Sequence, residues 1–297
     1  MTSNSNWQTY RVILRLRAPL HIGWGKVSYL QRTRPYVTGR VLRGALVNRV
    51  GRNGNIRGEN PLDPFRAVSK TFAQYLTFTY FYPALKDDGG WKAHFSWDDE
   101  SAFRRRFLSS YAGTALEYPQ QSAAEGLLRE IEFISPYTLD TGEPVYLMGY
   151  IFVDEGREKY DWQGALKRIQ LGGERGYGWG EAQAEVIELL EPGNGRLSLF
   201  GQEVVLDGSD RCPRLKLTEG ARAWAHVWAT GAGSVSGAIE PLVGREWRAN
   251  NAQSPQGRHI GQHLKFDGVC FAPGSLVAKE TTFSIEEGGY WRVEGTP

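Results

Sequence analysis

The sequence predicts an α+β protein in which a ferredoxin-like, RRM-like βαββαβ domain is followed by a second, β-rich half. Apolar and basic residues alternate in 10–17, and apolar residues recur at helical spacing in 38–51 and 161–173. The elements also follow one another in the order strand, helix, strands, helix, strand. Since helix signals are weak beyond residue 196, we expect the second half to be a degenerate ferredoxin-like unit.

The first predicted elements are a strand over 10–17 and a helix over 38–51. The strand has one apolar face for the core and one face that presents Arg11, Arg15 and Arg17. Thr38 is the expected N-cap of the helix, and Gly51 is its expected end. The intervening residues 19–37 and the following residues 53–64 read as loops.

The middle of the chain supplies the next predicted strands. Residues 75–85 alternate and are rich in aromatic and β-branched side chains, which favours a strand. A polar insert over 86–100 and a short helix over 101–109 follow. Residues 127–137 and 144–155 read as the two strands of a hairpin, with 140–143 as its turn.

The carboxylates of Asp98, Asp99 and Glu100 precede the short helix, where they complement its dipole more simply than they would serve a metal or acid–base site.

The last elements of the first domain surround a glycine-rich loop. Asp161 is the expected N-cap of an amphipathic helix over 161–173, and 180–191 reads as a strand. The stretch EPGNGR (191–196) then interrupts the pattern, so we expect domains at 1–192 and 197–297. In the second domain, short strands are expected at 197–206, 222–230, 264–272, 275–285 and 290–294.

Composition indicates a globular protein without a membrane segment. The 297 residues are 41% hydrophobic, which is enough for a sizeable core, and contain no apolar run of membrane-spanning length. The N-terminus lacks the pattern of a secretory signal, and Cys212 and Cys270 form no disulfide framework. We therefore expect a cytoplasmic protein with no membrane partner.

Basic residues are concentrated near the N-terminus. Residues 1–58 hold eleven of the 35 basic side chains, ten of them arginine, and none of the 33 acidic ones. Arginine binds phosphate bidentately and stacks on bases. Although a solvated basic face is the simpler interpretation of short charge runs, this long run without acids favours an anionic polymer as partner.

The stretch LGGERGYGWGEA (171–182) is the most unusual local feature. Glycines permit left-handed turns and close approach of another backbone, and their free N–H groups can surround phosphate oxygens. Arg175 adds charge, while Tyr177 and Trp179 add faces for stacking. The alternative is a tight structural turn with Trp179 in the core. The pattern is neither a Rossmann fingerprint nor a P-loop.

Three segments together resemble the RAMP superfamily of CRISPR–Cas proteins. APLHIGWG (18–25) is similar to the family's loop after the first strand, and TRPYVTGRVLRGAL (33–46) is similar to the motif that begins its first helix. LGGERGYGWGEA is similar to its glycine-rich loop, and FAPGSLV (271–277) resembles a strand of two-domain members. The resemblance is clear over 10–190 and weaker over the last hundred residues.

The resemblance implies one of three roles in RNA-guided antiviral defence. A backbone subunit that cleaves target RNA is disfavoured, because residues 18–38 lack the aspartate that such subunits use. A metal-independent endoribonuclease that processes precursor RNA remains open, with His21 as its candidate catalytic histidine. The favoured role is the non-catalytic subunit of type III complexes, most like those of types III-D and III-B, that holds the 5′ handle of the guide RNA. A scaffold that bridges only proteins is the alternative outside nucleic-acid binding.

This role implies guide RNA, a polymerase-like large subunit and backbone RAMP subunits as partners, with no cofactor and no metal. His259 and His263 stand four residues apart, but the glycines around them disfavour a helical metal site, and 244–263 reads as a long loop. For Arg43, a surface ion pair is as plausible as phosphate binding. The candidate RNA-binding residues are His21, Gly23, Lys26, Arg32, Arg34, Tyr36, Gly39, Arg40, Arg43, Gly173, Arg175, Gly176, Tyr177, Gly178 and Trp179.

Overall fold

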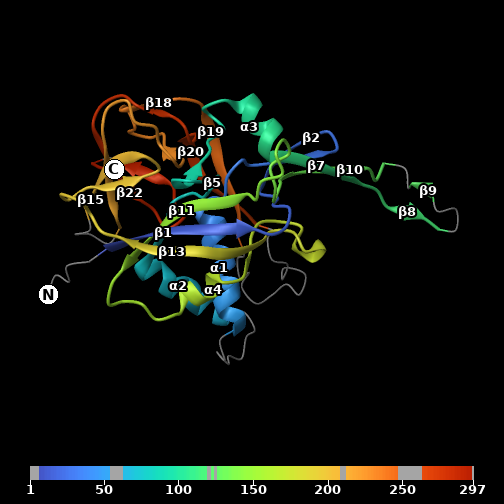
Figure 1. Ribbon diagram of the computed structural model, residues 1–297, viewed down its shortest axis with the longest axis horizontal. Coiled ribbons are helices and arrows are strands. Elements are labelled where there is room, and N and C mark those ends of the chain that lie inside the picture. Colours follow the sequence, from blue (N-terminus) through green and yellow to red (C-terminus); the bar gives the residue numbers. More distant parts are fainter. Residues whose placement is uncertain are drawn as a thin grey trace.

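The protein is an α+β molecule rich in strands (Figure 1). A computed structural model describes residues 7–53, 63–118, 122–123, 126–207, 212–246 and 263–295. No helix in these segments has both the length and the apolar character needed to cross a membrane.

A seven-stranded antiparallel sheet forms the centre of the molecule. Its order is β12-β13-β1-β11-β5-β6, and β4 also pairs with β11. The strands are β1 (Trp7–Leu16), β4 (Leu76–Phe78), β5 (Tyr82–Asp87), β6 (Gly90–Ala93), β11 (Tyr146–Asp154), β12 (Ile169–Gln170) and β13 (Glu181–Leu190).

Three helices cover one face of this sheet (Figure 1). They are α1 (Gly39–Asn53), α2 (Asp63–Tyr75) and α4 (Trp162–Leu166). Val12 and Leu14 of β1 pack there with Leu46 of α1, Phe72 of α2 and Leu166 of α4, all of them buried. Alternate residues of β1 thus supply the core under the helices, as their spacing predicts.

The opposite face of the central sheet is also covered, which the sequence did not lead us to expect. Ile13 lies on the same face as Arg11 and is fully buried against the C-terminal half. Arg11 itself pairs with Glu188 of the neighbouring strand at 2.5 Å. Both faces of β1 therefore pack on other layers, whereas Arg15 stays partly exposed and Arg17 is exposed just after the end of the strand.

The C-terminal half contributes the layer on that face. Its eight-stranded sheet has the order β14-β15-β16-β22-β23-β17-β20-β19, and no helix occurs in the described part of 197–295. The strands are β14 (Leu197–Leu199), β15 (Gln202–Asp207), β16 (Arg214–Leu217), β17 (Val227–Trp228), β19 (Ile239–Glu246), β20 (His263–Phe271), β22 (Thr281–Ile285) and β23 (Trp291–Val293), with β18 (Val235–Ser236) and β21 (Leu276–Val277) forming a separate pair.

A third layer extends away from the body as an arm (Figure 1). Its sheet has the order β2-β3-β10-β7, in which only β3 and β10 run parallel. The arm contains β2 (Gly23–Val27), β3 (Leu30–Thr33), α3 (Glu100–Phe107), β7 (Leu108–Gly113), β8 (Leu116–Glu117), β9 (Ser122–Ala123) and β10 (Arg129–Ile134).

The predicted hairpin of 127–137 with 144–155 is wrong. β10 belongs to the arm and pairs with β7 and β3, whereas β11 lies in the central sheet beside β1. The two strands meet only at the bridge between Tyr137 and Pro144. The chain between them therefore crosses from one sheet to the other.

Other boundaries also differ from expectation. Residues 19–37, expected to be a loop, contain the hairpin β2–β3, and the helix α2 precedes a strand that is broken into β4 and β5. The helix expected over 161–173 ends at Leu166, although Asp161 caps it by accepting a hydrogen bond from Gly164 N at 2.7 Å. Asp99 likewise caps α3 through Ala102 N, as its position at a helix start predicts.

Candidate nucleic-acid interface

The glycine-rich loop and the loop after β1 are joined by backbone hydrogen bonds. Gly173 N donates to His21 O at 2.9 Å, and Gly180 N donates to Pro19 O at 2.7 Å. Two of the three segments that carry the family resemblance therefore lie side by side, although about 150 residues separate them in the sequence. The fold therefore brings these two segments together.

The closest approach to the bare glycine backbone comes from the protein itself. A Cβ on Gly172 would lie 2.3 Å from His21 O, and one on Gly180 would lie 1.8 Å from Leu171 O. Both residues have positive φ, at +70° and +79°. Gly176 and Gly178 instead have open space where a Cβ would stand. The first pair therefore serves folding, while the second pair leaves the outer backbone of the loop accessible.

The loop is held rigidly at its base. Gln170 Nε2 donates to both Arg175 O and Trp179 O at 3.0 Å, and a short 3₁₀ turn spans Arg175–Tyr177. Trp179 is half-buried, with its ring centroid 5.1 Å from that of Phe133. Tyr177 is 71% exposed. The alternative of a structural turn with Trp179 in the core therefore applies in part to Trp179, whereas the Tyr177 ring is accessible from solvent.

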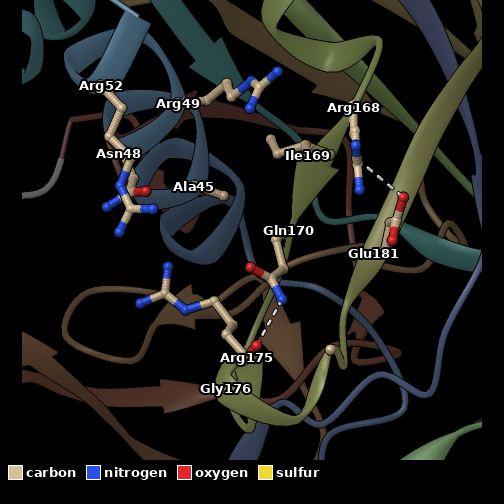
Figure 2. Close-up of a pocket in the computed structure, with 11 residues that line it drawn as sticks. Ala45, Asn48, Arg49, Arg52, Arg168, Ile169, Gln170, Arg175, Gly176 and Glu181 are labelled. Atoms are coloured by element: carbon tan, nitrogen blue, oxygen red, sulfur yellow. Dashed lines mark hydrogen bonds and ion pairs between the residues drawn. The ribbon is translucent and has the colours of Figure 1, made fainter.

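An arginine-lined groove of about 620 Å³ runs between α1 and the glycine-rich loop (Figure 2). Ala45, Asn48, Arg49 and Arg52 line its helix side at i, i+3, i+4, i+7 spacing, which places them on one face of α1. The other side is formed by Arg168, Ile169, Gln170, Arg175, Gly176, Gly178 and Glu181.

The groove carries a net positive charge. Arg168 pairs with Glu181 at 3.1 Å. Across the described segments, no acidic side chain forms an ion pair with Arg49, Arg52 or Arg175. Figure 2 shows Arg175 extending from the loop toward the α1 side of the groove. Three guanidinium groups are thus available for an anion. Arg49 and Arg52 were not among the candidate RNA-binding residues. Their spacing of three residues in the predicted helix places them on one face, and this signal could have identified them from the sequence.

Two of the predicted RNA contacts, Arg34 and Tyr36, lie inside the protein. Tyr36 is 5% exposed and its ring stacks on Tyr80. Arg34 donates to the Tyr36 hydroxyl at 2.9 Å and to Glu240 Oε1 at 2.8 Å. A nucleobase cannot reach the buried Tyr36 ring, and the Arg34 guanidinium already pairs with a carboxylate. We therefore remove both residues from the candidate RNA-binding residues. The sequence could not show that the C-terminal half covers them.

Burial and pairing determine the charge states around Arg34. Burial alone would lower the pKa of Arg34, but Tyr36 and Glu240 raise it above its usual value. Burial raises the pKa of Tyr36. Burial would also raise the pKa of Glu240, yet hydrogen bonding to His226 and the charge of Arg34 bring it down to about 2. Glu240 is therefore ionised, and the Arg34 charge is neutralised inside the protein.

The first turn of α1 is also engaged with the C-terminal half. Arg40 pairs with Asp267, and Arg43 pairs with Glu287 and donates to Ser69 O at 2.8 Å. A Cβ on Gly39 would lie 2.9 Å from Gly288 O. The absence of a side chain at Gly39 therefore lets the turn before β23 pack against it, and a ligand has no room there. Acidic residues far along the chain therefore engage both arginines of this turn, and for Arg43 the ion-pair alternative is the one that the structure contains.

The remaining candidates lie around β2 and β3. His21 is 6% exposed, and its Nδ1 lies 2.7 Å from Glu132 O, as expected of a structural loop histidine. Arg32 pairs with the buried Glu132 at 3.2 Å. Gly23 and Lys26 are exposed, since β2 is exposed along its length. Lys26 thus stays accessible, whereas Arg32 is tied to the arm.

Metal ligation gains no support from the described residues, which hold no cluster of three potential ligands. His259 lies outside those residues, and His263 begins β20.

Comparisons with known proteins give only loose structural likenesses. No protein-family model matches the chain, and no curated protein matches it. A chain of Type III-B Cmr-beta bound to cognate target RNA and AMPPnP is similar at 11% identity and a TM-score of 0.49, covering 90% of this chain and 85% of that one. A chain from Type III-B Cmr-beta bound to cognate target RNA has 11% identity and a TM-score of 0.37, covering 59% of this chain and 96% of that one. One from the apo state has 10% identity and a TM-score of 0.36, covering 62% and 97%.

Proposed function

We propose that this protein is a non-catalytic RNA-binding subunit of a type III CRISPR effector complex. In this role it holds the 5′ repeat-derived handle of the guide RNA and caps the backbone filament during RNA-guided antiviral interference. The proposal rests on the three sequence segments that resemble RAMP proteins and on the surface that two of them form with α1. Its expected partners are the polymerase-like large subunit and the backbone RAMP subunits.

The strand order supports a ferredoxin-like first domain. Along the chain, β1 is followed by α1 and α2, then β5 and β11, then α4 and β13. In space the strands lie in the order β13-β1-β11-β5, with all three helices on one face. A βαββαβ unit folds in this way. We propose domains at 1–192 and 197–297, with the second as a degenerate relative of the first.

The observation that carries the proposal is the arginine groove beside the glycine-rich loop. Arg49, Arg52 and Arg175 line one groove and have no acidic partner among the described residues. Guanidinium groups bind phosphate oxygens bidentately, so several along one groove suit a polyanion such as RNA. Much of the affinity is then electrostatic and falls steeply with salt.

The direct test measures binding of single-stranded repeat RNA by fluorescence anisotropy over a range of salt concentrations. We expect Arg49→Ala, Arg52→Ala and Arg175→Ala each to weaken binding and to reduce the salt slope by about one. Arg196→Ala is the matched control, since Arg196 is exposed in the turn between the two halves, away from the residues that line the groove. Equal affinities for all four variants and the wild type would contradict the proposal.

Specificity for the handle is tested with the same assay. A repeat RNA that carries the 5′ handle should bind more tightly than an RNA of equal length with a scrambled handle. Equal binding of the two RNAs would show that the protein binds RNA without recognising the handle, and would contradict the handle-holding role. Copurification of the tagged protein with a large polymerase-like subunit and guide RNA tests the proposed assembly.

An endoribonuclease is the second candidate because His21 lies beside the glycine-rich loop. A general base must reach the proton that it removes, and the burial of His21 with Nδ1 on Glu132 O disfavours this role. The test is incubation of the protein with repeat RNA in the presence of a chelator. Specific cleavage that His21→Ala abolishes would establish the nuclease and overturn the non-catalytic role.

A further inference from the structure

The glycine-rich loop has a second side, which faces the arm. Arg175, Gly176 and Gly178 line the groove on the α1 side. Tyr177 and Trp179, which alternate with Gly176 and Gly178, contact β7 and β10 of the arm instead. The loop is therefore a ridge, with the Arg175 guanidinium on the groove side and two aromatic rings on the arm side.

Tyr177 is held in place although its ring is largely exposed. Arg129 Nη2 donates to the Tyr177 hydroxyl at 3.1 Å, and its guanidinium carbon lies 5.4 Å from the Tyr177 ring centroid. Arg129 Nη1 is 4.0 Å from Glu174 Oε2. Since Glu174 and Tyr177 belong to the loop and Arg129 to β10, this contact fixes the ring relative to the arm.

Glu174 supports the interpretation of this contact as a functional one. Its φ is +53°, a left-handed conformation that is costly for a residue with a side chain. A glycine would adopt this conformation without strain, but it would lack the carboxylate that meets Arg129. Strained residues of this kind cluster at binding sites.

Tyr111 of β7 provides a second exposed ring beside the loop. It is 60% exposed, and its ring centroid is 6.4 Å from that of Trp179 in an edge-on arrangement. Trp179 in turn packs on Phe133 of β10. The half-buried Trp179 thus links Tyr111 of β7 and Phe133 of β10 to the loop.

We infer that Tyr177 and Tyr111 form a stacking platform for unpaired nucleobases of a single-stranded RNA whose phosphates lie in the arginine groove. This inference rests on the proposed RNA binding, and it adds the position at which the nucleobases bind. A single strand can cross the ridge with phosphates on the arginine side and bases on the aromatic side. A duplex cannot, because its bases are stacked on one another and their faces are not available.

The platform has a chemical preference of its own. Aromatic rings stack on any base, so the platform selects unpaired bases rather than a sequence. The Arg129 guanidinium beside Tyr177 offers a second planar surface and a positive charge for the same base or its neighbouring phosphate. Single-stranded RNA is therefore expected to bind more tightly than the duplex of the same sequence.

The test uses the full-length protein and single-stranded repeat RNA that carries 5-iodouridine for photocrosslinking. We expect crosslinks at Tyr177 or Tyr111. We expect Tyr177→Ala and Tyr111→Ala to weaken binding roughly tenfold, with the salt slope unchanged, because stacking releases no counterions. Tyr177→Phe should keep most of the affinity. Tyr137→Ala is the control, since Tyr137 is 49% exposed and lies outside the platform.

The possible results separate this inference from the proposed function. If Arg175→Ala weakens binding while both tyrosine variants bind like the wild type and no platform crosslink forms, the platform is wrong and RNA binding stands. Duplex binding as tight as that of the single strand would also overturn the platform. If the wild type binds no RNA, both proposals fail. Urea unfolding midpoints of the variants establish that each one is folded.

Discussion

The N-terminal arginines acquire different roles from their surroundings. Arg34, Arg40 and Arg43 pair with Glu240, Asp267 and Glu287 of the C-terminal half. Arg49 and Arg52, on the same helix as two of these, line the groove. The sequence shows a run of basic residues without acids, yet it cannot show which of them meet carboxylates more than 200 residues away. Charge density alone therefore does not distinguish the paired arginines of the first turn of α1 from the arginines that line the groove.

A buried hydrogen-bond network surrounds His226. Glu240 is ionised and can only accept, so His226 Nε2 carries the proton that it donates to this carboxylate. His226 Nδ1 then accepts from the Tyr80 hydroxyl at 2.7 Å, and burial raises the pKa of Tyr80 so that this hydroxyl keeps its proton. The network fixes the neutral histidine as one tautomer between the central sheet and the C-terminal half.

We predict that acid destabilises the protein through His226. Burial and the Arg34 charge lower the pKa of His226 more than the Glu240 hydrogen bond raises it. The unfolded chain therefore takes up a proton near pH 6.5, before the folded chain does, so stability is present above that pH and is lost below it. Urea midpoints at pH 7.5 and 5.5 measure this loss.

The variant His226→Gln removes this titration and should narrow the difference between the two midpoints, although it lowers stability at both pH values. Burial lowers the pKa of His94 as well. The variant His94→Gln therefore measures how much of the stability loss between pH 7.5 and pH 5.5 comes from this second histidine. A midpoint difference that stays the same in His226→Gln would contradict the role of His226. Protonation of Glu240, whose pKa is about 2, belongs to a separate and more acidic range.

At the scale of elements, the glycine-rich loop contains two kinds of glycine: some have a positive φ and a close neighbour where a Cβ would stand, and others have open space there. We predict that Gly172→Ala destabilises the protein by about 1–3 kcal/mol, because it combines a positive φ with a Cβ 2.3 Å from His21 O. It should also weaken RNA binding, since the loop would move away from the loop after β1. Urea unfolding and RNA anisotropy measure the two effects.

Gly176→Ala is the matched control four residues away. Nothing lies within 4 Å of its added Cβ, and Gly176 is not among the glycines with positive φ. We expect a change in stability of less than about 0.5 kcal/mol. Equal destabilisation by the two substitutions would show that backbone geometry does not distinguish these positions.

The strands of the arm show where sequence patterns are insufficient. The strands β10 and β11 lie within the predicted strands 127–137 and 144–155, but they pair in different sheets. Two strands joined by a turn usually pair with each other. Here β10 pairs with β7 and β3 instead, and its Glu132 receives hydrogen bonds from Thr33 N at 2.9 Å and from Arg32 Nε at 3.2 Å. Strand partners depend on such distant contacts.

At the scale of the whole molecule, the two halves share a hydrophobic core. Ile13, Met148 and Phe152 of the central sheet are buried together with side chains of the C-terminal strands and loops. The contributions of the C-terminal half include Leu215, Trp224, Phe283, Ile285 and Trp291. Whatever the boundary between the predicted domains, the surface between them contains a shared apolar core together with the ion pairs of Arg34, Arg40 and Arg43.

We therefore predict that the two halves unfold together. Far-UV circular dichroism and tryptophan fluorescence should give coincident urea midpoints, because neither half can expose the shared core and stay folded. Trp224→Ala should lower the free energy of unfolding by about 3–5 kcal/mol for the molecule as a whole, since its side chain is fully buried. Two separate transitions, only one of them shifted by this substitution, would establish independent domains.

The sequence by itself determined the α+β class, most strands of the central sheet, the start of α1 and the position of the glycine-rich loop. These features follow from local spacing and from the conformations that glycine and capping residues favour. Only the tertiary structure decided which arginines are free, because their carboxylate partners lie on distant strands. It likewise decided that the C-terminal half covers Tyr36 and that the arm places Tyr111 and Arg129 beside Tyr177.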